Sequence, residues 1–563
     1  MGRFEPLSIH LDSIFCKGPA TNRIRPKQSD GHDCSSATWS ARRKNRLING
    51  ARRYGCRWQQ NARPLHNYPV HLPVDVLPKT GVCSRLTAFV RETFLGLYSL
   101  RTIRSLMRSS ECAPMNKRTF LKVCSSLIGS PFLAPLFAWA AGEKLKNWAG
   151  NLEYSTENLY SARTLDQVRE FVKKQNSLKV LGTRHCFNKI ADSKRQLISL
   201  NTDQAIALDA ASRTVTVEGG LTYGHLSPYL DSKGWALHNL ASLPHISIAG
   251  ACSTATHGSG EKNGNLAAAV VALEIVNAAG EVVQLSRAKD GQEFLGAVVG
   301  LGALGVITKL TLDIQPTFQM QQYVYENLPL SELKNNFDAI ESSAYSVSLF
   351  TDWQKQRINE VWLKCRTDQK PTFEALPEFF GAKKATRNVH PIIELSAENC
   401  TEQMGVPGPW YERLPHFRMG FTPSAGRELQ SEYFVPRHNA VEAISAIERL
   451  HDQISPSLLI AEIRAIAADE LWMSPCYKQS CVTIHFTWKQ DWPTVSQLLP
   501  VIEKQLAPFR SRPHWGKLFS IPPAQLQTEY ERLPDFVALA EKFDPHGKFR
   551  NDFLNANIFG VAS

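Results

Sequence analysis

The sequence predicts a protein of two α+β domains, each built on short strands rather than on a regular alternation of strand and helix. Between residues 147 and 316, runs of alternating apolar and polar residues pair into hairpins and are interrupted by single helices. In the remainder, up to residue 563, the readable elements follow the order β-α-β-β-α-β, which is typical of an antiparallel sheet with helices on one face. A length of 563 residues with 43% hydrophobic residues is ordinary for a globular chain of more than one domain.

Residues 1–114 differ in composition from the rest of the chain. They carry 19 Lys and Arg against 7 Asp and Glu, which is the whole formal net charge of +12, and they hold five of the 12 cysteines. Basic clusters such as residues 41–46 allow a nucleic-acid-binding arm. Because no period of 2 or 3.6 is sustained, we interpret the segment as disordered sequence or as translation from a start codon placed too far upstream, and we expect no nucleic-acid partner.

A secretory signal pattern begins at Met115. A basic start is followed by an apolar run too short to span a bilayer and by Ala-Trp-Ala at residues 138–140. We expect residues 115–141 to be an export signal of the twin-arginine type, with Lys117 in place of the first arginine, and the protein to be periplasmic or extracellular. An internal buried hairpin is the alternative, and a genuine upstream start would mask the signal and leave the protein in the cytoplasm. No later segment is apolar enough over 18 residues to insert in a membrane.

In the first domain, Thr164 and Gln167 form a capping box that begins a helix. The elements expected after it are a strand at 178–181, a hairpin of 205–209 with 214–218, a helix at 222–232, a hairpin of 273–277 with 281–285, and a strand at 306–314. Residues 300–305 match the G-x-G-x-x-G dinucleotide fingerprint, but a helix at 292–299 precedes them and a strand follows. Because the fingerprint requires the reverse order, a nicotinamide-binding Rossmann domain is improbable.

Two segments of this domain are suited to a ligand. After the strand at 178–181 the chain turns on Gly182 and continues Thr-Arg-His-Cys-Phe-Asn, and such a turn exposes backbone N–H groups that cradle phosphate. Residues 239–260 are rich in Gly, Ala, Ser and Thr and nearly free of charge, which lets the backbone approach a large ligand. The alternatives are a structural loop with an unrelated His185 and a flexible linker.

In the second domain an irregular middle region precedes the readable elements. These are strands at 431–435, 458–466 and 481–489, helices at 439–453 and 493–508, and a last strand that begins near Lys517. Because side chains alternate along a strand, residues 482, 484, 486 and 488 form an apolar face for the helices, and His485 and Thr487 point the other way. Glu462 and Arg464 also share a face. A polar face of this kind suits a polyhydroxy substrate, or is a solvated surface with cross-strand ion pairs.

The Gly182–His185 turn and residues 239–260 resemble the flavin domain of the vanillyl-alcohol oxidase superfamily, and the resemblance is closest to the alditol (xylitol) oxidases. It runs from Asn147 to the C-terminus and includes the string at 399–410. It implies a PCMH-type FAD-binding domain over 147–316, a substrate-binding cap domain over 317–563, and FAD bound covalently through His185. The positions that match cofactor contacts are Val180, Leu181, Gly182, Thr183, Arg184, His185, Cys186, Ser242, Ser247, Gly250, Thr254, His257 and Ile307.

The same resemblance implies an active site on the polar sheet face. Ser242, Glu462, Arg464, Thr487 and Lys517 match substrate-binding positions, and His485 matches an active-site histidine. The implied reaction is oxidation of the terminal alcohol of an alditol such as xylitol to the aldose, with O2 reduced to H2O2. Lys517 and Arg464 would hold the reacting oxygen and His485 is a possible base, but the sequence does not separate Lys517 from His485 as proton acceptor.

Three alternatives to an alditol oxidase stay open at this stage. A sugar-1,4-lactone oxidase would share the fold, a polyol dehydrogenase would use an acceptor other than oxygen, and a non-catalytic carbohydrate-binding protein would lack flavin. We expect a monomer with no metal site, because the cysteines and histidines show no metal-ligand spacing.

Overall fold

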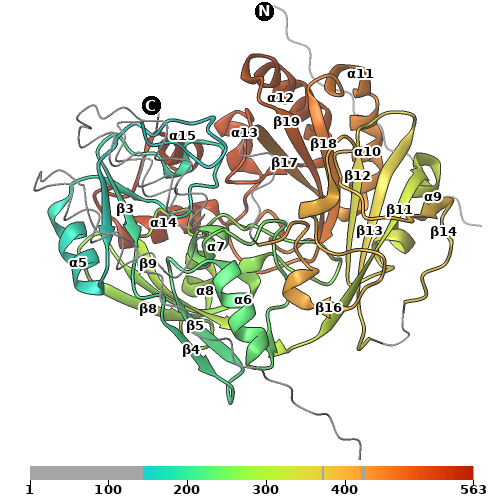
Figure 1. The fold of residues 1–563 in the computed structure, drawn as a ribbon. Helices are drawn as coiled ribbons and strands as arrows, with labels where there is room; N and C mark the ends of the chain where they lie inside the picture. The colour runs from blue at the N-terminus through green and yellow to red at the C-terminus, as the bar shows by residue number, and fades with distance from the viewer. Residues whose placement is uncertain (1–143, 370–372, 420–426, 562–563) are drawn as a thin grey trace, which may run out of the picture. The chain divides into compact units, whose positions relative to one another are not determined.

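The computed structural model describes residues 144–369, 373–419 and 427–561 (Figure 1). The expected N-terminal extension at 1–114 and the expected signal peptide at 115–141 lie outside the described residues. In the part of the chain that is described, no helix combines the length and the apolar character needed to cross a bilayer.

The N-terminal half holds two main sheets. Strands β1, β3 and β2 form a parallel sheet, and a five-stranded antiparallel sheet has the order β4-β5-β9-β7-β8. The elements are β1 Leu159–Ala162, α5 Leu165–Lys174, β2 Leu178–Val180, β3 Gln196–Leu200, β4 Ile206–Asp209, β5 Thr214–Glu218, α6 Tyr223–Ser232, β6 Trp235–Ala236, α7 Ile248–Ser253, β7 Val270–Val276, β8 Val282–Ser286, α8 Arg287–Val298, β9 Val306–Asp313 and β10 Gln315–Pro316.

The predicted local structure of this half is confirmed. The Thr164 side chain accepts a hydrogen bond from the Gln167 N–H at the start of α5, and the inward face of that helix is buried. Both predicted hairpins form, as β4 with β5 and β7 with β8. Residues 300–305 lie between α8 and β9, so this G-x-G-x-x-G string does not have the strand-then-helix setting of a dinucleotide fingerprint.

The C-terminal half is built on one ten-stranded sheet with the order β14-β15-β11-β13-β12-β18-β19-β17-β20, in which β16 pairs with β11. The elements are β11 Gln319–Pro329, α9 Leu330–Glu341, β12 Ser346–Thr351, β13 Arg357–Arg366, β14 Glu378–Phe379, β15 Ala382–Lys384, β16 Gly408–Pro409, β17 Glu428–Pro436, α10 Ala440–Glu448, α11 His451–Ile454, β18 Leu458–Ile466, β19 Cys481–Lys489, α12 Trp492–Leu506, β20 Arg512–Pro513, α13 Pro523–Thr528, α14 Leu533–Phe543 and α15 Asp552–Asn557.

The predicted β-α-β-β-α-β unit is present as β17-α10-β18-β19-α12-β20, all antiparallel. Helices α10 and α12 pack on one face of its sheet (Figure 1). The predicted apolar face of β19 is buried in the core there, where the rings of Phe486 and Trp488 stack with centroids 5.0 Å apart.

Two sequence-based expectations for this half are wrong. The middle region is not irregular over residues 319–366, because β11, α9, β12 and β13 form a second β-α-β-β unit that joins the first through β12 and β18. Lys517 does not begin a strand. The last strand is β20, which ends at Pro513, and Lys517 lies in the turn that follows. Only two residues of β20 pair with β17, which is too short a ladder to leave an alternating pattern.

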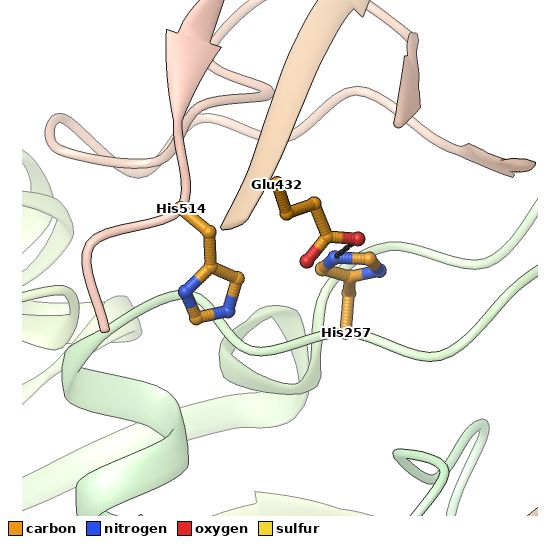
Figure 2. A group of neighbouring side chains, drawn as sticks. All are labelled: His257, Glu432 and His514. Carbon is orange, nitrogen blue, oxygen red and sulfur yellow. Dashed lines mark ion pairs between the residues drawn. The ribbon is translucent and has the colours of Figure 1, made fainter. Parts of the chain in front are cut away.

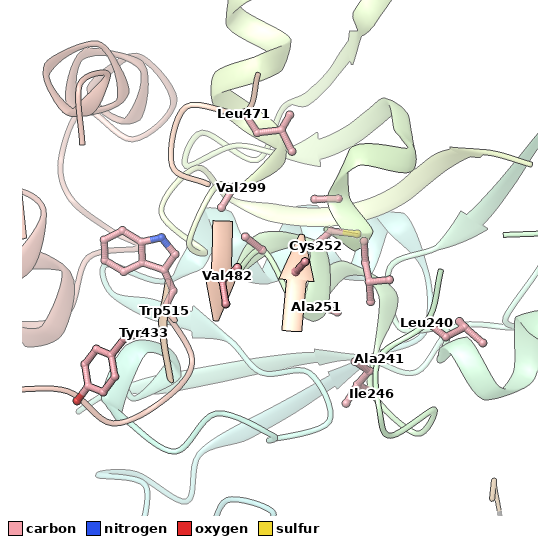
Figure 3. Packing of buried hydrophobic residues seen from close by; sticks show 14 of the residues in the cluster. Leu240, Ala241, Ile246, Ala251, Cys252, Val299, Tyr433, Leu471, Val482 and Trp515 are labelled. Atoms are coloured by element: carbon pink, nitrogen blue, oxygen red, sulfur yellow. The ribbon is translucent and has the colours of Figure 1, made fainter. Parts of the chain in front are cut away.

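The two halves are packed together by shared hydrophobic contacts. One cluster joins Val482, Tyr433 and Trp515 of the C-terminal half to Ala251 and Val299 of the N-terminal half (Figure 3). The end of the chain also returns to the N-terminal half, where Phe549 is buried with residues of β1, α5, β2 and β3. The Lys548 ammonium there donates to the carbonyls of Val172 and Ala278. These contacts hold the facing surfaces of the two halves in fixed positions.

Candidate active site

A cavity of about 380 Å³ lies where the two halves meet. The structure brings every site residue predicted from the sequence to the wall of this one cavity. They are Val180, Leu181, Gly182, Thr183, Arg184, His185, Cys186, Ser242, Ser247, Gly250, Thr254, His257, Ile307, Glu462, Arg464, His485, Thr487 and Lys517. Their common placement is a structural result, and the role of each residue stays a prediction.

The turn after β2 presents free backbone donors. The Leu181 N–H donates to Ile198, and the Phe187 N–H donates to Gly516 across the two halves. Among the described residues, the N–H groups at positions 182, 183, 185 and 186 have no hydrogen-bond acceptor. Consecutive unpaired N–H groups in a turn form an anion-binding concavity, as expected for a pyrophosphate. Arg184 has a φ of 62°, a left-handed conformation that glycine adopts more easily, and its guanidinium donates to the Lys146 carbonyl.

The turn leaves no room for an added side chain. A Cβ on Gly182 would stand 2.6 Å from Ser247 Oγ, so the turn and the residues before α7 approach closely only because position 182 is glycine. The Ser247 N–H donates a hydrogen bond to Thr183 Oγ1 at 3.2 Å, which joins the two segments. Backbone from both predicted ligand segments therefore forms one continuous wall of the cavity.

His185 stands at this wall between two aromatic rings. Its centroid is 4.6 Å from that of Trp148 and 5.2 Å from that of His245. Burial, with smaller contributions from His245 and Lys517, holds the pKa of His185 well below its usual value, so the ring is neutral. Its Nδ1 atom is buried and has no hydrogen-bond partner among the described residues. A neutral imidazole with an unpaired nitrogen, beside a turn of free N–H groups, fits a bound FAD.

The opposite wall is the polar face of the large sheet. Three charged or titratable residues stand in one row across three strands, because Glu432 of β17 lies opposite His485 of β19, which lies opposite Glu462 of β18. Lys517 approaches from the turn after β20, and its backbone is held by Asn188, at the end of the turn that follows β2. Asn188 donates its amide to the carbonyls of Trp515 and Lys517, at 2.8 and 2.7 Å.

Glu432 is the charged centre of this wall, and the sequence reasoning missed it. Its carboxylate binds Lys517 Nζ at 2.6 Å and Arg464 Nη2 at 2.7 Å, and His257 Nε2 is 3.3 Å away. Burial opposes ionisation of Glu432, but Lys517, His257 and Arg464 together hold its pKa well below the usual range. The available signal was the alternation along 431–435, which turns Glu432 to the face opposite Tyr433 and Val435.

His485 is neutral, and both of its ring nitrogens are engaged. Burial and the neighbouring Lys517 charge lower its pKa to about 4. Its Nδ1 is 2.8 Å from Lys517 Nζ and its Nε2 is 3.0 Å from Thr487 Oγ1. Burial also lowers the pKa of Lys517, against the opposing effect of Glu432. An amine with a lowered pKa at a cavity wall is suited to exchange a proton with a ligand.

Three side chains in this region are close enough together to raise the question of a metal ion. Ligand atoms of His257, Glu432 and His514 all lie within 4.8 Å of one another, and Figure 2 shows the Glu432 carboxylate next to the His257 ring with His514 to one side. The Glu432 oxygens, however, already bind the cations of Lys517 and Arg464. A divalent ion would meet two positive charges within a few ångströms, so we assign these residues to the ion-pair cluster rather than to a metal site.

Comparison with known proteins agrees with this fold and pocket. Residues 159–286 match the family described as "FAD binding domain", and residues 422–557 match "D-arabinono-1,4-lactone oxidase". Among solved structures, cholesterol oxidase from Brevibacterium sterolicum shares the fold, with a TM-score of 0.58 at 14% sequence identity over 73% of this chain and 96% of that one. The fold and the cavity therefore define an FAD-dependent oxidoreductase of the PCMH type.

Sequence comparison narrows this class. The alditol oxidase of a Streptomyces species is 45% identical over 418 residues, which cover 74% of this chain and 99% of that protein. The chain belongs to the alditol oxidase family. More distant relatives are the L-gulonolactone oxidase of Bos taurus and the L-gulono-1,4-lactone dehydrogenase of Mycobacterium tuberculosis. Both are 26% identical, over 73% and 70% of this chain and 98% and 92% of their own lengths.

Proposed function

We propose that this protein is an FAD-dependent alditol oxidase, which converts the terminal CH2OH of a polyol to an aldehyde and reduces O2 to H2O2. The observation that carries the proposal is the pairing, across one cavity, of the His185 turn with a wall of donors and acceptors suited to several hydroxyl groups. The 45% identity to an alditol oxidase over nearly its whole length supports the same activity.

The polar wall offers each kind of partner that a polyol needs. Glu462 Oε1 is bound by His416 Nε2 at 2.7 Å, and no described residue hydrogen-bonds Oε2, which leaves that oxygen to accept from a substrate hydroxyl. Arg464 donates Nη2 to Glu432 and lines the cavity. Thr487, whose oxygen is 3.0 Å from His485 Nε2, and Ser242 add hydroxyl groups on two sides.

Lys517 is the residue we assign to the reacting oxygen. Two of its hydrogen-bonding directions are taken by Glu432 and His485, and the third is available to the cavity that it lines. Burial lowers the pKa of Lys517, so its ammonium releases a proton more readily than that of an exposed lysine. The amine formed in this way takes up the hydroxyl proton of the substrate, and Glu432 stabilises the ammonium that results. His485 acts behind Lys517, because its own nitrogens are already engaged. A bound FAD would supply the acceptor for the hydride that leaves the substrate carbon bearing that hydroxyl group.

The cofactor attachment is a second part of the proposal. His185 presents an unpaired, neutral ring nitrogen to the cavity, and we propose that it bonds covalently to the flavin while the turn at 182–186 holds the pyrophosphate. Val180, Leu181, Ser247, Gly250, Thr254, His257 and Ile307 would complete the FAD contacts. Cofactor that remains with the protein after acid precipitation would support the bond, and flavin released quantitatively would contradict it.

One set of assays distinguishes an alditol oxidase from a lactone oxidase and from a dehydrogenase. An oxygen electrode with xylitol, sorbitol and a galactonolactone separates an alditol oxidase from a lactone oxidase, which remains the second candidate because residues 422–557 match that family. Ala241, a small residue in the cavity wall, leaves room for O2 and favours the oxidase over a dehydrogenase. Little peroxide under air, with rapid reduction of an artificial acceptor, would instead identify a dehydrogenase.

Location and assembly complete the proposal. We propose that residues 115–141 direct export and that the mature protein works as a monomer outside the cytoplasm. Expression of the chain from Met115 with a C-terminal tag tests this, because export predicts a shortened product in the periplasm. Gel filtration of that product gives its oligomeric state.

A further inference from the structure

A second buried chain of polar groups runs from the cavity wall, at Glu462 and His416, to Lys364 behind it. Lys364 on β13 contacts His416, and His416 contacts Glu462 on β18. All three residues are at most 5% exposed, and the imidazole is enclosed by the rings of Phe350 and Trp362, each 5.4 Å away. Polar groups in such surroundings are costly unless each has a partner, so their hydrogen bonds determine their protonation.

The three acceptors around Lys364 fix the tautomer of His416. Lys364 Nζ is 2.5 Å from the Leu414 carbonyl oxygen, 3.1 Å from that of Pro415, and 3.1 Å from His416 Nδ1. An ammonium group has three N–H donors and no acceptor, so the three contacts use all of them. Nδ1 therefore carries the lone pair and Nε2 carries the hydrogen, which His416 donates to Glu462 Oε1 at 2.7 Å.

This arrangement keeps Glu462 an acceptor only. Oε1 receives the His416 hydrogen and lies 3.5 Å from Arg464 Nε, and these two groups hold the pKa of Glu462 below its usual range even though burial opposes ionisation. Oε2 remains for the cavity. The backbone of His416 also reaches the other half of the protein, because its N–H donates to the Ser242 carbonyl at 3.2 Å. One residue thus contacts two predicted substrate-binding residues that are 220 positions apart in sequence.

We propose that Lys364 and His416 are positioning residues that hold Glu462 ionised and aimed at a substrate hydroxyl, and so set the affinity for polyols. The inference rests on the proposed function, since it assigns Glu462 to the substrate. It gives the cavity a specificity element that begins at its wall with His416 and continues behind it to Lys364. A ligand that places another acceptor at Glu462 Oε2 meets a fixed negative charge, and a hydroxyl meets a fixed acceptor.

The proposal includes a dependence on pH. The groups that face Lys364 are His416, the Glu462 carboxylate, the Cys400 thiol and Arg464, and burial is the largest cause that lowers the pKa of Lys364, to about 7. A neutral amine must direct its lone pair at a donor, and of its three contacts only the imidazole can become one. Loss of the Lys364 proton therefore moves the His416 hydrogen to Nδ1 and removes the donor to Glu462, so KM for the polyol should rise above about pH 7.

The test compares two variants of His416 in the flavin-loaded protein. His416→Leu removes the donor, and we expect KM for xylitol to rise about 10-fold or more while kcat changes by less than about 3-fold, because a hydrogen bond to a charged group is lost from ground state and transition state alike. His416→Gln keeps an N–H near Nε2 and should restore KM to within about 3-fold. An unchanged KM in His416→Leu, or equal losses in both variants, would overturn the proposal.

A double-mutant cycle shows whether His416 acts through Glu462. In a Glu462→Gln background, His416→Leu should change KM by less than about 2-fold, whereas additive effects would mean that the two residues act separately. Lys364→Met should raise KM as His416→Leu does and abolish the rise above pH 7. A Lys364→Met protein that keeps the parent pH profile would contradict the tautomer argument.

A readout without substrate separates this inference from the proposed function. In protein labelled with 15N-histidine, the His416 signal should show the Nε2–H tautomer in the parent chain and a smaller fraction of it in Lys364→Met. If no polyol reduces the flavin but this tautomer is found, the proposed function fails while the hydrogen-bond chain stands. If polyols are oxidised and the Nδ1–H tautomer is found in the parent, the inference fails alone.

Discussion

Removal of the Lys517 amine is the most direct test of the proposed chemistry. Lys517→Met keeps most of the side-chain volume and deletes the group that contacts Glu432 at 2.6 Å and His485 at 2.8 Å. Positioned proton-transfer groups contribute about 100-fold to 10,000-fold, so we expect anaerobic flavin reduction by xylitol to slow by about 100-fold or more, or about 2.7 kcal/mol. Glu432 keeps Arg464 as its partner, so the variant should still fold and bind flavin.

The variant should also acquire a new dependence on pH. In the parent, burial and then Lys517 lower the pKa of His485 to about 4, so the ring stays neutral through the neutral range. Without the Lys517 charge this pKa rises, although burial still holds it below its usual value. The residual reduction rate of Lys517→Met should therefore change with pH at a higher pH than the one at which His485 of the parent titrates.

The assay is stopped-flow loss of oxidised-flavin absorbance at saturating polyol, without oxygen. Lys542→Met is the matched control, because Lys542 pairs with Glu293 on the surface with 63% of its side chain exposed, and such pairs contribute little. Both proteins should purify with the same flavin content. A Lys517→Met protein reduced as fast as the Lys542→Met control would refute the assignment of Lys517 to the reacting oxygen.

Three further predictions concern the cofactor and stability. His185→Ala should release its flavin into the supernatant on acid precipitation, whereas the parent pellet stays yellow. Gly182→Ala should lower the flavin content, because the added Cβ would stand 2.6 Å from Ser247 Oγ. A Gly182→Ala, Ser247→Ala double variant lacks that oxygen and should recover the flavin content. Equal flavin content in the single and double variants would exclude the steric explanation. Burial raises the pKa of Glu341 to about 8, so between about pH 4.5 and 8 the folded chain keeps a proton that the unfolded chain releases. The free energy of unfolding therefore falls by up to about 1.4 kcal/mol for each pH unit of increase in this range. Glu341→Gln should accordingly raise the melting temperature more at pH 8 than at pH 5. An equal shift at the two pH values would contradict the raised pKa of Glu341.

Local patterns predicted the elements whose two faces differ in polarity. β19 alternates strictly, and this predicted an apolar face against the helices with His485 and Thr487 on the opposite face, which in the structure forms part of the cavity wall. The capping box at Thr164 and both hairpins have short-range signals that tertiary contacts do not overrule. The cavity residues themselves came from the family resemblance, because nothing in the spacing of Lys517 and His185 shows that they meet.

The strands that the sequence did not predict, β11, β12 and β13, have polar residues buried on both sides of the sheet. On β13 the side that carries Lys364 and Glu360 is covered by residues 385–417, so the strand shows no contrast between core and solvent. His416 belongs to a loop, and only its contacts with residues 52 and 46 positions away reveal its role. Such pairings follow from the sheet order, which a single sequence does not contain.

The return of the C-terminus has a consequence for biosynthesis. Lys179, beside the turn at 182–186, is buried, and its ammonium donates to the carbonyl of Phe549, 370 residues later. The small parallel sheet under that turn also takes Phe549 into its apolar interior. Until synthesis has passed Phe549 this support is missing, so we expect flavin capture to follow synthesis of that segment.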